Sequence, residues 1–200
     1  MSHKKYKRVY RMLTRFGFEL LTIIAGILIA LFVNNWQIRN HDRAMLTSTL
    51  SSLSQEFEEN IANINKIQPR LERFRDTLEF YKSNTGISIY ELTTRAPGLG
   101  TAELHTTNWQ TTLSSGSVRL LNFETVTLLS KIDSKHQELK NETAQLISII
   151  YSPALYRKDE EGYHYRKVLG DWIGSYLGNE QELIVLYKEF NSLLGNKGNN

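Results

Sequence analysis

The sequence has no cysteine among its 200 residues, and this absence excludes three kinds of site. Disulfide bridges, thiolate metal centres and cysteine nucleophiles all need the thiol group. Proline is also scarce, with three residues, and no low-complexity tract is present. Both observations argue against long disordered regions. We therefore expect a folded chain without covalent cross-links.

Acidic residues are missing from the first 15 positions, which contain six basic residues. The other 185 residues contain 18 basic and 21 acidic side chains, so the pI near 9.0 reflects the N-terminal tail and not a domain. A basic domain would suggest nucleic acid, whereas a basic tail beside an apolar run is typical of the cytoplasmic face of a membrane. We therefore predict a lipid bilayer, and no nucleic acid, as a partner.

Charged residues are also absent from residues 20–33, where Thr22 is the only polar side chain. As a helix these residues span roughly 21 Å, which is less than the roughly 30 Å of a hydrocarbon core. The flanks lengthen the apolar stretch, interrupted by Glu19, to the 23 residues 16–38, enough to cross a bilayer with some tilt. We predict a retained transmembrane helix. The alternatives are a cleaved signal peptide, whose A-x-A cleavage pattern is missing, and a buried core helix.

The basic residues also predict the orientation of this helix. Six of them precede the span, whereas Arg39 and Arg43 are the first to follow it. The positive-inside rule then places the basic tail of residues 1–15 in the cytoplasm. Residues 39–200 would form an extracytoplasmic domain, which is periplasmic in a bacterium with two membranes. We therefore expect a single-pass protein of the bacterial inner (cell) membrane.

Three residues of the span are candidates for contact with a partner helix. Glu19 is its one acidic side chain, and it either lies near the headgroups beside Arg15 or makes a polar contact with another helix. Gly26 and Ala30 form a small-xxx-small pair that would let a second helix approach closely.

Residues 18–36 also carry a distinctive pattern. Glu19 is followed by Gly-Ile-Leu-Ile-Ala-Leu at 26–31 and then by Asn34, Asn35 and Trp36. This pattern resembles the signature of a family of uncharacterised single-pass membrane proteins found in Bacteroidetes and related bacteria. The resemblance implies a membrane anchor followed by a helical domain, and it implies no activity. Trp36 and the two asparagines would mark the outer membrane interface.

After the span, apolar residues recur with a mean step of 3.5 residues. This period is typical of a helix that packs along one seam in a bundle or a coiled coil. We expect this helix over about residues 43–82, continuous with the span and kinked or broken near Gln68 because Pro69 removes a helix hydrogen bond. The seam begins with Leu46, Leu50, Leu53, Phe57, Ile61 and Ile64 and continues to Tyr81.

Further helices are predicted over about residues 106–115, 118–151, 163–177 and 180–194. Residues 87–92 read as a short extended piece, Gly178 as a helix stop and Asn179 as the following N-cap. The fold class is therefore all-α, with an N-terminal transmembrane helix that continues into a long helix and a helix-bundle extracytoplasmic domain. The C-terminal third of the chain is rich in aromatic residues, which we interpret as core residues or, alternatively, as the lining of a ligand groove or a partner surface: Tyr151, Tyr156, Tyr163, Tyr165, Trp172, Tyr176 and Tyr187.

The sequence contains no recognisable catalytic or metal-binding pattern. No two of the five histidines are spaced three or four residues apart, and no phosphate-binding or dinucleotide-binding loop is present. We therefore predict no enzyme activity, no cofactor and no metal. The favoured hypothesis is an envelope interaction or assembly protein that pairs with itself or with another membrane protein. The alternative is a sensor module that binds a small molecule of unknown identity and signals through a membrane partner.

Overall fold

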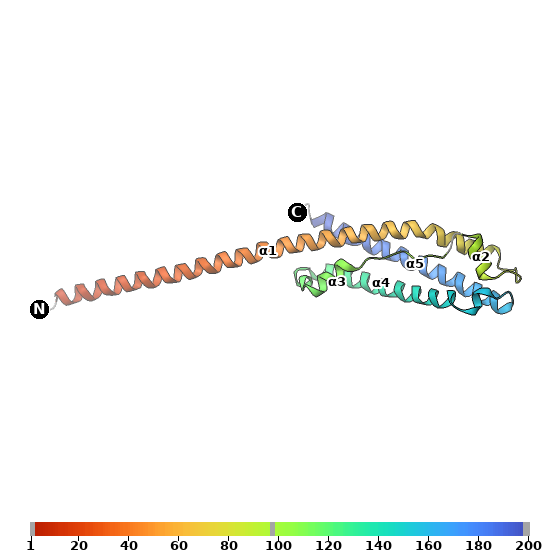
Figure 1. The fold of residues 1–200 in the computed structure, drawn as a ribbon. Coiled ribbons are helices and arrows are strands. Elements are labelled where there is room, and N and C mark those ends of the chain that lie inside the picture. Colours follow the sequence, from red (N-terminus) through yellow and green to blue (C-terminus); the bar gives the residue numbers. More distant parts are fainter. Residues whose placement is uncertain (1–2, 97–98, 198–200) are drawn as a thin grey trace. The chain divides into compact units, whose positions relative to one another are not determined.

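The computed structural model describes the backbone of residues 3–96 and 99–197 and the side chains of residues 16–96 and 99–195. Every element in these ranges is helical, which confirms the all-α prediction (Figure 1). The chain divides into two compact units, Met1–Thr47 and Ser48–Asn200. The elements are α1 (His3–Phe80), α2 (Ile89–Arg95), α3 (Thr107–Ser114), η1 (Ser117–Leu120), α4 (Phe123–Ile150), η2 (Pro153–Tyr156) and α5 (Glu160–Lys197).

The second unit is built from three long helices. The part of α1 that follows Ser48 runs in the same direction as α4, and α5 returns in the opposite direction (Figure 1). Their inward faces form one hydrophobic core. Within this core the ring of Phe57 stacks on Tyr187 at 4.6 Å between centroids and meets Phe190 edge-on at 5.0 Å. Burial of each such side chain contributes roughly 1.5–3 kcal/mol, so this packing is the main source of stability.

The apolar seam of α1 supplies one wall of that core. Six of its members are almost completely buried: Leu53, Phe57, Ile64, Leu71, Phe74 and Leu78. Leu50 and Ile61 are partly buried against them. The seam that the sequence predicted therefore exists, and from Leu53 onward it packs inside the chain's own domain.

The predicted break near Gln68 is absent, because α1 continues through Pro69 to Phe80. Proline lacks the N–H that would bond to the carbonyl four residues earlier. Pro69 is exposed, so water can solvate that carbonyl. Leu71 and Phe74, two and five residues later, are fully buried and hold the helix against the core. Packing on the opposite face thus compensates for the lost hydrogen bond.

The predicted helix stop at Gly178 is also wrong, since α5 is a single helix from Glu160 to Lys197. Gly178 does not take the positive φ of a terminating glycine, which among the described residues only Gly116 has. Asn179 is not an N-cap. Its amide nitrogen instead donates to the carboxylate of Glu142 on α4 at 3.0 Å, and this bond ties the two helices together.

The predicted extended piece over residues 87–92 is wrong, because residues 89–92 form the first turn of α2. Ser88 is its N-cap: the hydroxyl accepts the N–H of Glu91, and the Glu91 carboxylate accepts the N–H of Ser88. This reciprocal pair is the capping box that Ser-x-x-Glu encodes. A similar cap explains why α4 begins at Phe123 and not at 118, because the Asn122 side chain accepts the N–H of Thr125 at 2.9 Å.

Candidate functional site

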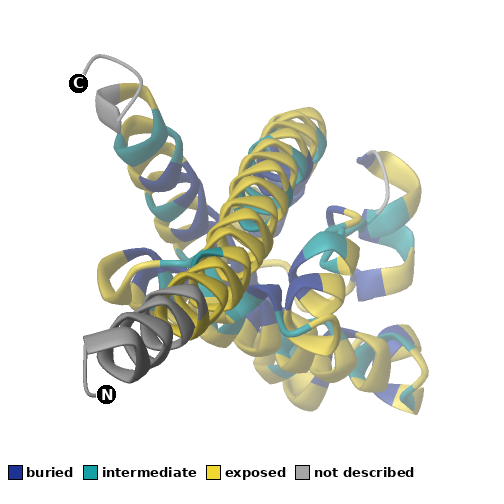
Figure 2. Cartoon of the chain, turned by 90° about the vertical axis from the view of Figure 1, so that its left-hand side faces the viewer, coloured by how far each residue is buried: buried dark blue, intermediate teal, exposed yellow. Residues whose placement is uncertain are grey.

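The first candidate site is the apolar segment of residues 16–38. α1 is the only described helix long and apolar enough to cross a membrane. The large apolar side chains of residues 16–38 are exposed over 48% (Ile24) to 76% (Phe18) of their surface. Figure 2 shows exposed residues around the circumference of this part of α1. The hydroxyl of Thr22 donates to the carbonyl of Phe18 at 2.9 Å, so the only polar side chain of residues 20–33 is satisfied within the helix.

The other residues predicted from the span are exposed as well. Glu19, Ala30 and Trp36 lie at the helix surface. A Cβ atom added to Gly26 would meet no atom within 4 Å, so the backbone there is open to a close neighbour. Asn34 and Asn35 are exposed in the same way. The side chain of Arg15 and those of the basic tail lie outside the described residues.

The second unit contains a buried polar cluster around Asn60 of α1. The Asn60 amide nitrogen donates to the carbonyl of His105 at 2.8 Å and to the hydroxyl of Tyr187 at 3.0 Å, and its oxygen accepts the His105 N–H at 2.7 Å. The Tyr187 hydroxyl also bonds to Nε2 of His136 on α4. Burial lowers the pKa of His136 to about 4 and raises the pKa of Tyr187. Both groups are therefore uncharged near neutral pH, and the cluster joins α1, α4 and α5.

A second buried polar group is Glu180 of α5, which is 0% exposed. Burial raises the pKa of this carboxyl to about 7, while the nearby side chains of Gln68 and Tyr176 offset part of the rise and Glu142 adds to it. No described side chain offers Glu180 an ion pair. A large fraction of Glu180 is consequently protonated at neutral pH.

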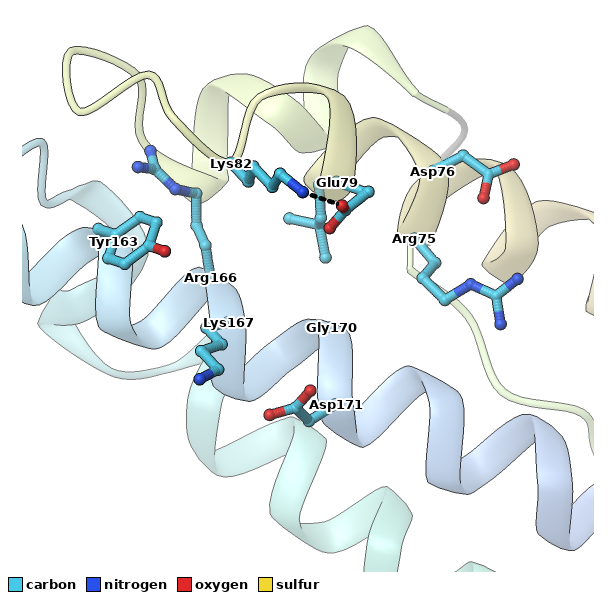
Figure 3. A pocket seen from close by; sticks show the side chains of 10 residues that line it. Arg75, Asp76, Glu79, Lys82, Tyr163, Arg166, Lys167, Gly170 and Asp171 are labelled. Atoms are coloured by element: carbon cyan, nitrogen blue, oxygen red, sulfur yellow. Dashed lines mark hydrogen bonds and ion pairs between the residues drawn. The ribbon is translucent and has the colours of Figure 1, made fainter.

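The third feature is a cavity of about 460 Å³ between the end of α1 and the first turns of α5. Figure 3 shows Arg75, Glu79 and Lys82 on one side and Arg166 and Asp171 on the other. Glu79 pairs with Lys82. The volume falls within the range of small-molecule sites, which is roughly 300–1,000 Å³. We call this space the Arg166 cavity.

Arg166 is the unusual residue of this cavity. It is 3% exposed, and its Nη1 donates to the carbonyl of Ile87 just before α2. Its Nε and Nη2 have no hydrogen-bond partner among the described atoms. The guanidinium carbon lies 5.9 Å from the ring centroid of Tyr163. Burial lowers the pKa of Arg166, and Tyr163 offsets part of this effect.

The structure divides the C-terminal aromatics between the two interpretations. Trp172, Tyr176 and Tyr187 belong to the core, and the indole N–H of Trp172 donates to the carbonyl of Glu142 at 3.0 Å. Tyr151 and Tyr156 are exposed, by 85% and 62%. Tyr163 is the aromatic that lines the Arg166 cavity.

Sequence reasoning missed Arg166 and Glu180, although a signal for both was present. Residues of α5 that face the core recur every three or four positions: Leu169, Ile173, Tyr176, Leu183, Tyr187 and Phe190. Arg166 and Glu180 occupy positions of the same series. A charged residue in an apolar helical series is therefore the sign of a buried charge.

Comparisons with known proteins found no relative of this chain. No family model matches it, and no curated protein or solved structure matches it either. The resemblance of residues 18–36 to a bacterial membrane-protein family stays a prediction.

Proposed function

We propose that this chain is a membrane-anchored interaction protein of the bacterial envelope, without catalysis of its own. Residues 16–38 would cross the inner membrane, and the helical domain would lie outside the cytoplasm. The exposure of residues 16–38 on all sides carries this proposal. A helix that is apolar all round needs an apolar surrounding, and the described chain does not supply one there.

The two parts of α1 differ in a way that supports an anchor. From Leu53 onward, buried residues such as Phe57 and Ile64 alternate with exposed Glu58 and Glu59. This is the pattern of a helix with one face in a core and one in water. Residues 16–38 have no charged face, and Glu19 is their only acidic residue. The same helix is therefore suited to lipid in its first part and to water in its second.

The burial of the seam changes which surface would mediate assembly. Leu53 and the seam residues after it are covered by the chain's own α4 and α5, so they do not offer a face to a partner. Gly26 and Ala30, the small-xxx-small pair of the span, are both exposed. Assembly through the membrane helix, with a second copy or with another membrane protein, is thus the form of the hypothesis that the contacts support.

Protease access to the full-length chain tests the anchor and its orientation. A tag at the C-terminus should be cleaved when protease is added to cells with a permeabilised outer membrane, and a tag at the N-terminus should survive until the inner membrane is opened. The chain should also keep its full mass and sediment with membranes after a high-salt wash. A soluble chain, or one shortened by about 35 residues as expected for signal cleavage, would contradict the proposal.

The second candidate function is a sensor or binding module, and the Arg166 cavity favours it. The cavity has a suitable volume, and its buried cation Arg166 has no counter-ion among the described side chains. A ligand bound there would be recognised outside the cytoplasm, and its signal would pass to a membrane partner. Ligand-dependent thermal stability of the full chain is the corresponding measurement.

A further inference from the structure

The guanidinium group of Arg166 has one edge without a hydrogen-bond partner among the described atoms. Nε and Nη2 of Arg166 lie on the same edge, and neither has a partner among the described atoms. The third nitrogen, Nη1, is already used by the carbonyl of Ile87. The free edge is the one that binds the two oxygens of a carboxylate or a phosphoryl group in parallel.

An unpaired edge of this kind is energetically costly. Transfer of an unpaired ion from water into a protein interior costs several kcal/mol. Arginine cannot avoid the cost by losing its proton, because it stays charged in proteins. The Tyr163 ring, whose centroid lies 5.9 Å from the guanidinium carbon, attracts the cation more weakly than a paired anion would. The charge of Arg166 is thus only partly compensated within the described chain.

The surroundings of Arg166 supply a place for the missing anion. Arg166 lines a cavity of about 460 Å³, together with the further cations Arg75 and Lys167. The side chains of Lys82 and Tyr163 line the same cavity and are 60% and 42% exposed. Because Nε and Nη2 are themselves buried, a ligand would reach them once neighbouring side chains of the cavity rotate.

We propose that the Arg166 cavity binds a small oxyanion, whose carboxylate or phosphoryl oxygens accept hydrogen bonds from Nε and Nη2 of Arg166. Asp76 and Asp171 line the same cavity and would repel a polyanion. The ligand therefore carries one oxyanion group and little further negative charge. This inference deepens the second candidate function and does not depend on the membrane anchor.

Thermal unfolding of the detergent-solubilised full chain tests the site. Sodium acetate and sodium phosphate are titrated separately, with sodium chloride at matched ionic strength as the reference. At least one of the two anions should raise the melting temperature of the unmodified chain above the chloride reference. The anion that does so identifies the ligand as a carboxylate or a phosphoryl compound.

Three variants assign the effect to the guanidinium. Arg166→Met should abolish the shift and melt no lower than the unmodified chain without anion, because it removes a buried charge. Arg166→Lys keeps the charge but cannot donate two parallel hydrogen bonds. It should raise the apparent Kd for the anion at least about tenfold. Arg73→Met is the matched control: Arg73 is exposed on α1 and does not line the cavity, so the shift should persist.

Two results would overturn the proposal. One is an equal anion-dependent shift in Arg166→Met and in the unmodified chain. The other is the lack of any shift with either anion above the chloride reference. Both results would leave the protease-access pattern unchanged, so failure of this site is distinguishable from failure of the membrane anchor.

Discussion

Asn60 of α1 donates a hydrogen bond of 3.0 Å to the hydroxyl of Tyr187 on α5, across 127 residues of sequence. The same amide group holds the segment before α3 through both backbone groups of His105. One side chain thus joins three parts of the domain. Its polar groups lie where the sequence pattern alone would place only apolar ones.

Replacement of Asn60 by alanine should destabilise the domain by about 3 kcal/mol. The change removes the side-chain partner of both backbone groups of His105 and one of the two partners of the Tyr187 hydroxyl, at roughly 1–3 kcal/mol for each group left unsatisfied. Asn63→Ala is the control, because Asn63 makes one exposed bond to the carbonyl of Glu103 and should cost less than about 1 kcal/mol. Urea unfolding measures both, and equal losses would argue against the cluster as a support of the fold.

Replacement of Glu180 by glutamine should stabilise the domain in alkali and not in acid. The folded-state pKa is raised to about 7 from 4.5, so the folded protein keeps a proton that the unfolded chain loses in this window. The contribution of Glu180 to stability therefore falls as the pH rises, by about 3 kcal/mol in total. Glu180→Gln cannot ionise and should be more stable than the unmodified chain by that order at pH 8. Near pH 4.5 the two should be equal.

The control for Glu180 lies on the same helix. Glu189 is exposed, so Glu189→Gln should change the free energy of unfolding little at either pH. A difference between Glu180→Gln and the unmodified chain that does not vary from pH 4.5 to pH 8 would exclude titration of the buried carboxyl.

His136 should produce a slope of the opposite sign. Burial lowers its pKa to about 4 from 6.5, so the unfolded chain takes up a proton that the folded chain refuses. Stability from this group is complete above pH 6.5 and is lost as the pH falls toward 4. In the unmodified chain the effects of His136 and Glu180 should nearly cancel between about pH 4.5 and 6.5. In Glu180→Gln the stability should rise with pH across that window, and a flat profile in this variant would contradict the assignment.

Cysteine cross-linking in membranes should report pairing of the anchor. The chain contains no cysteine, so a single introduced thiol gives no background. Gly26→Cys should form disulfide-linked species under mild oxidation, because the backbone there is open to a neighbouring helix. Leu28→Cys points to nearly the opposite side of the helix, at about 200° from Gly26, and should cross-link less. Equal cross-linking at both positions would indicate random collision.

The sequence was sufficient for the elements that depend on local pattern. The repeat from Leu53 to Leu78 predicted a helix with one buried face, because that periodicity repeats within a single element. Ser88 and Glu91 also contained enough information for α2, and the capping box was overlooked. The stop at Gly178 failed for a different reason, since the bond between Asn179 and Glu142 comes from a helix about 40 residues away and outweighs the local preference of glycine.

The Arg166 cavity could not be predicted from local sequence patterns. Its walls come mainly from the end of α1 and the first turns of α5, which are separated by about 80 residues. The position of Arg166 in an apolar series indicated burial, but not that its Nε and Nη2 would lack a partner. That property follows from which carbonyl happens to face Nη1, here that of Ile87.

The composition of α5 has a consequence for the order in which the domain folds. Gly170, Gly174 and Gly178 all lie in the interior of this helix, and each lowers its intrinsic helical preference by roughly 1 kcal/mol relative to alanine. We expect α5 to be a weak helix by itself and to gain its structure as it docks on α1 and α4. One wall of the Arg166 cavity would then form late in folding. An incompletely folded chain would therefore not bind the proposed anion.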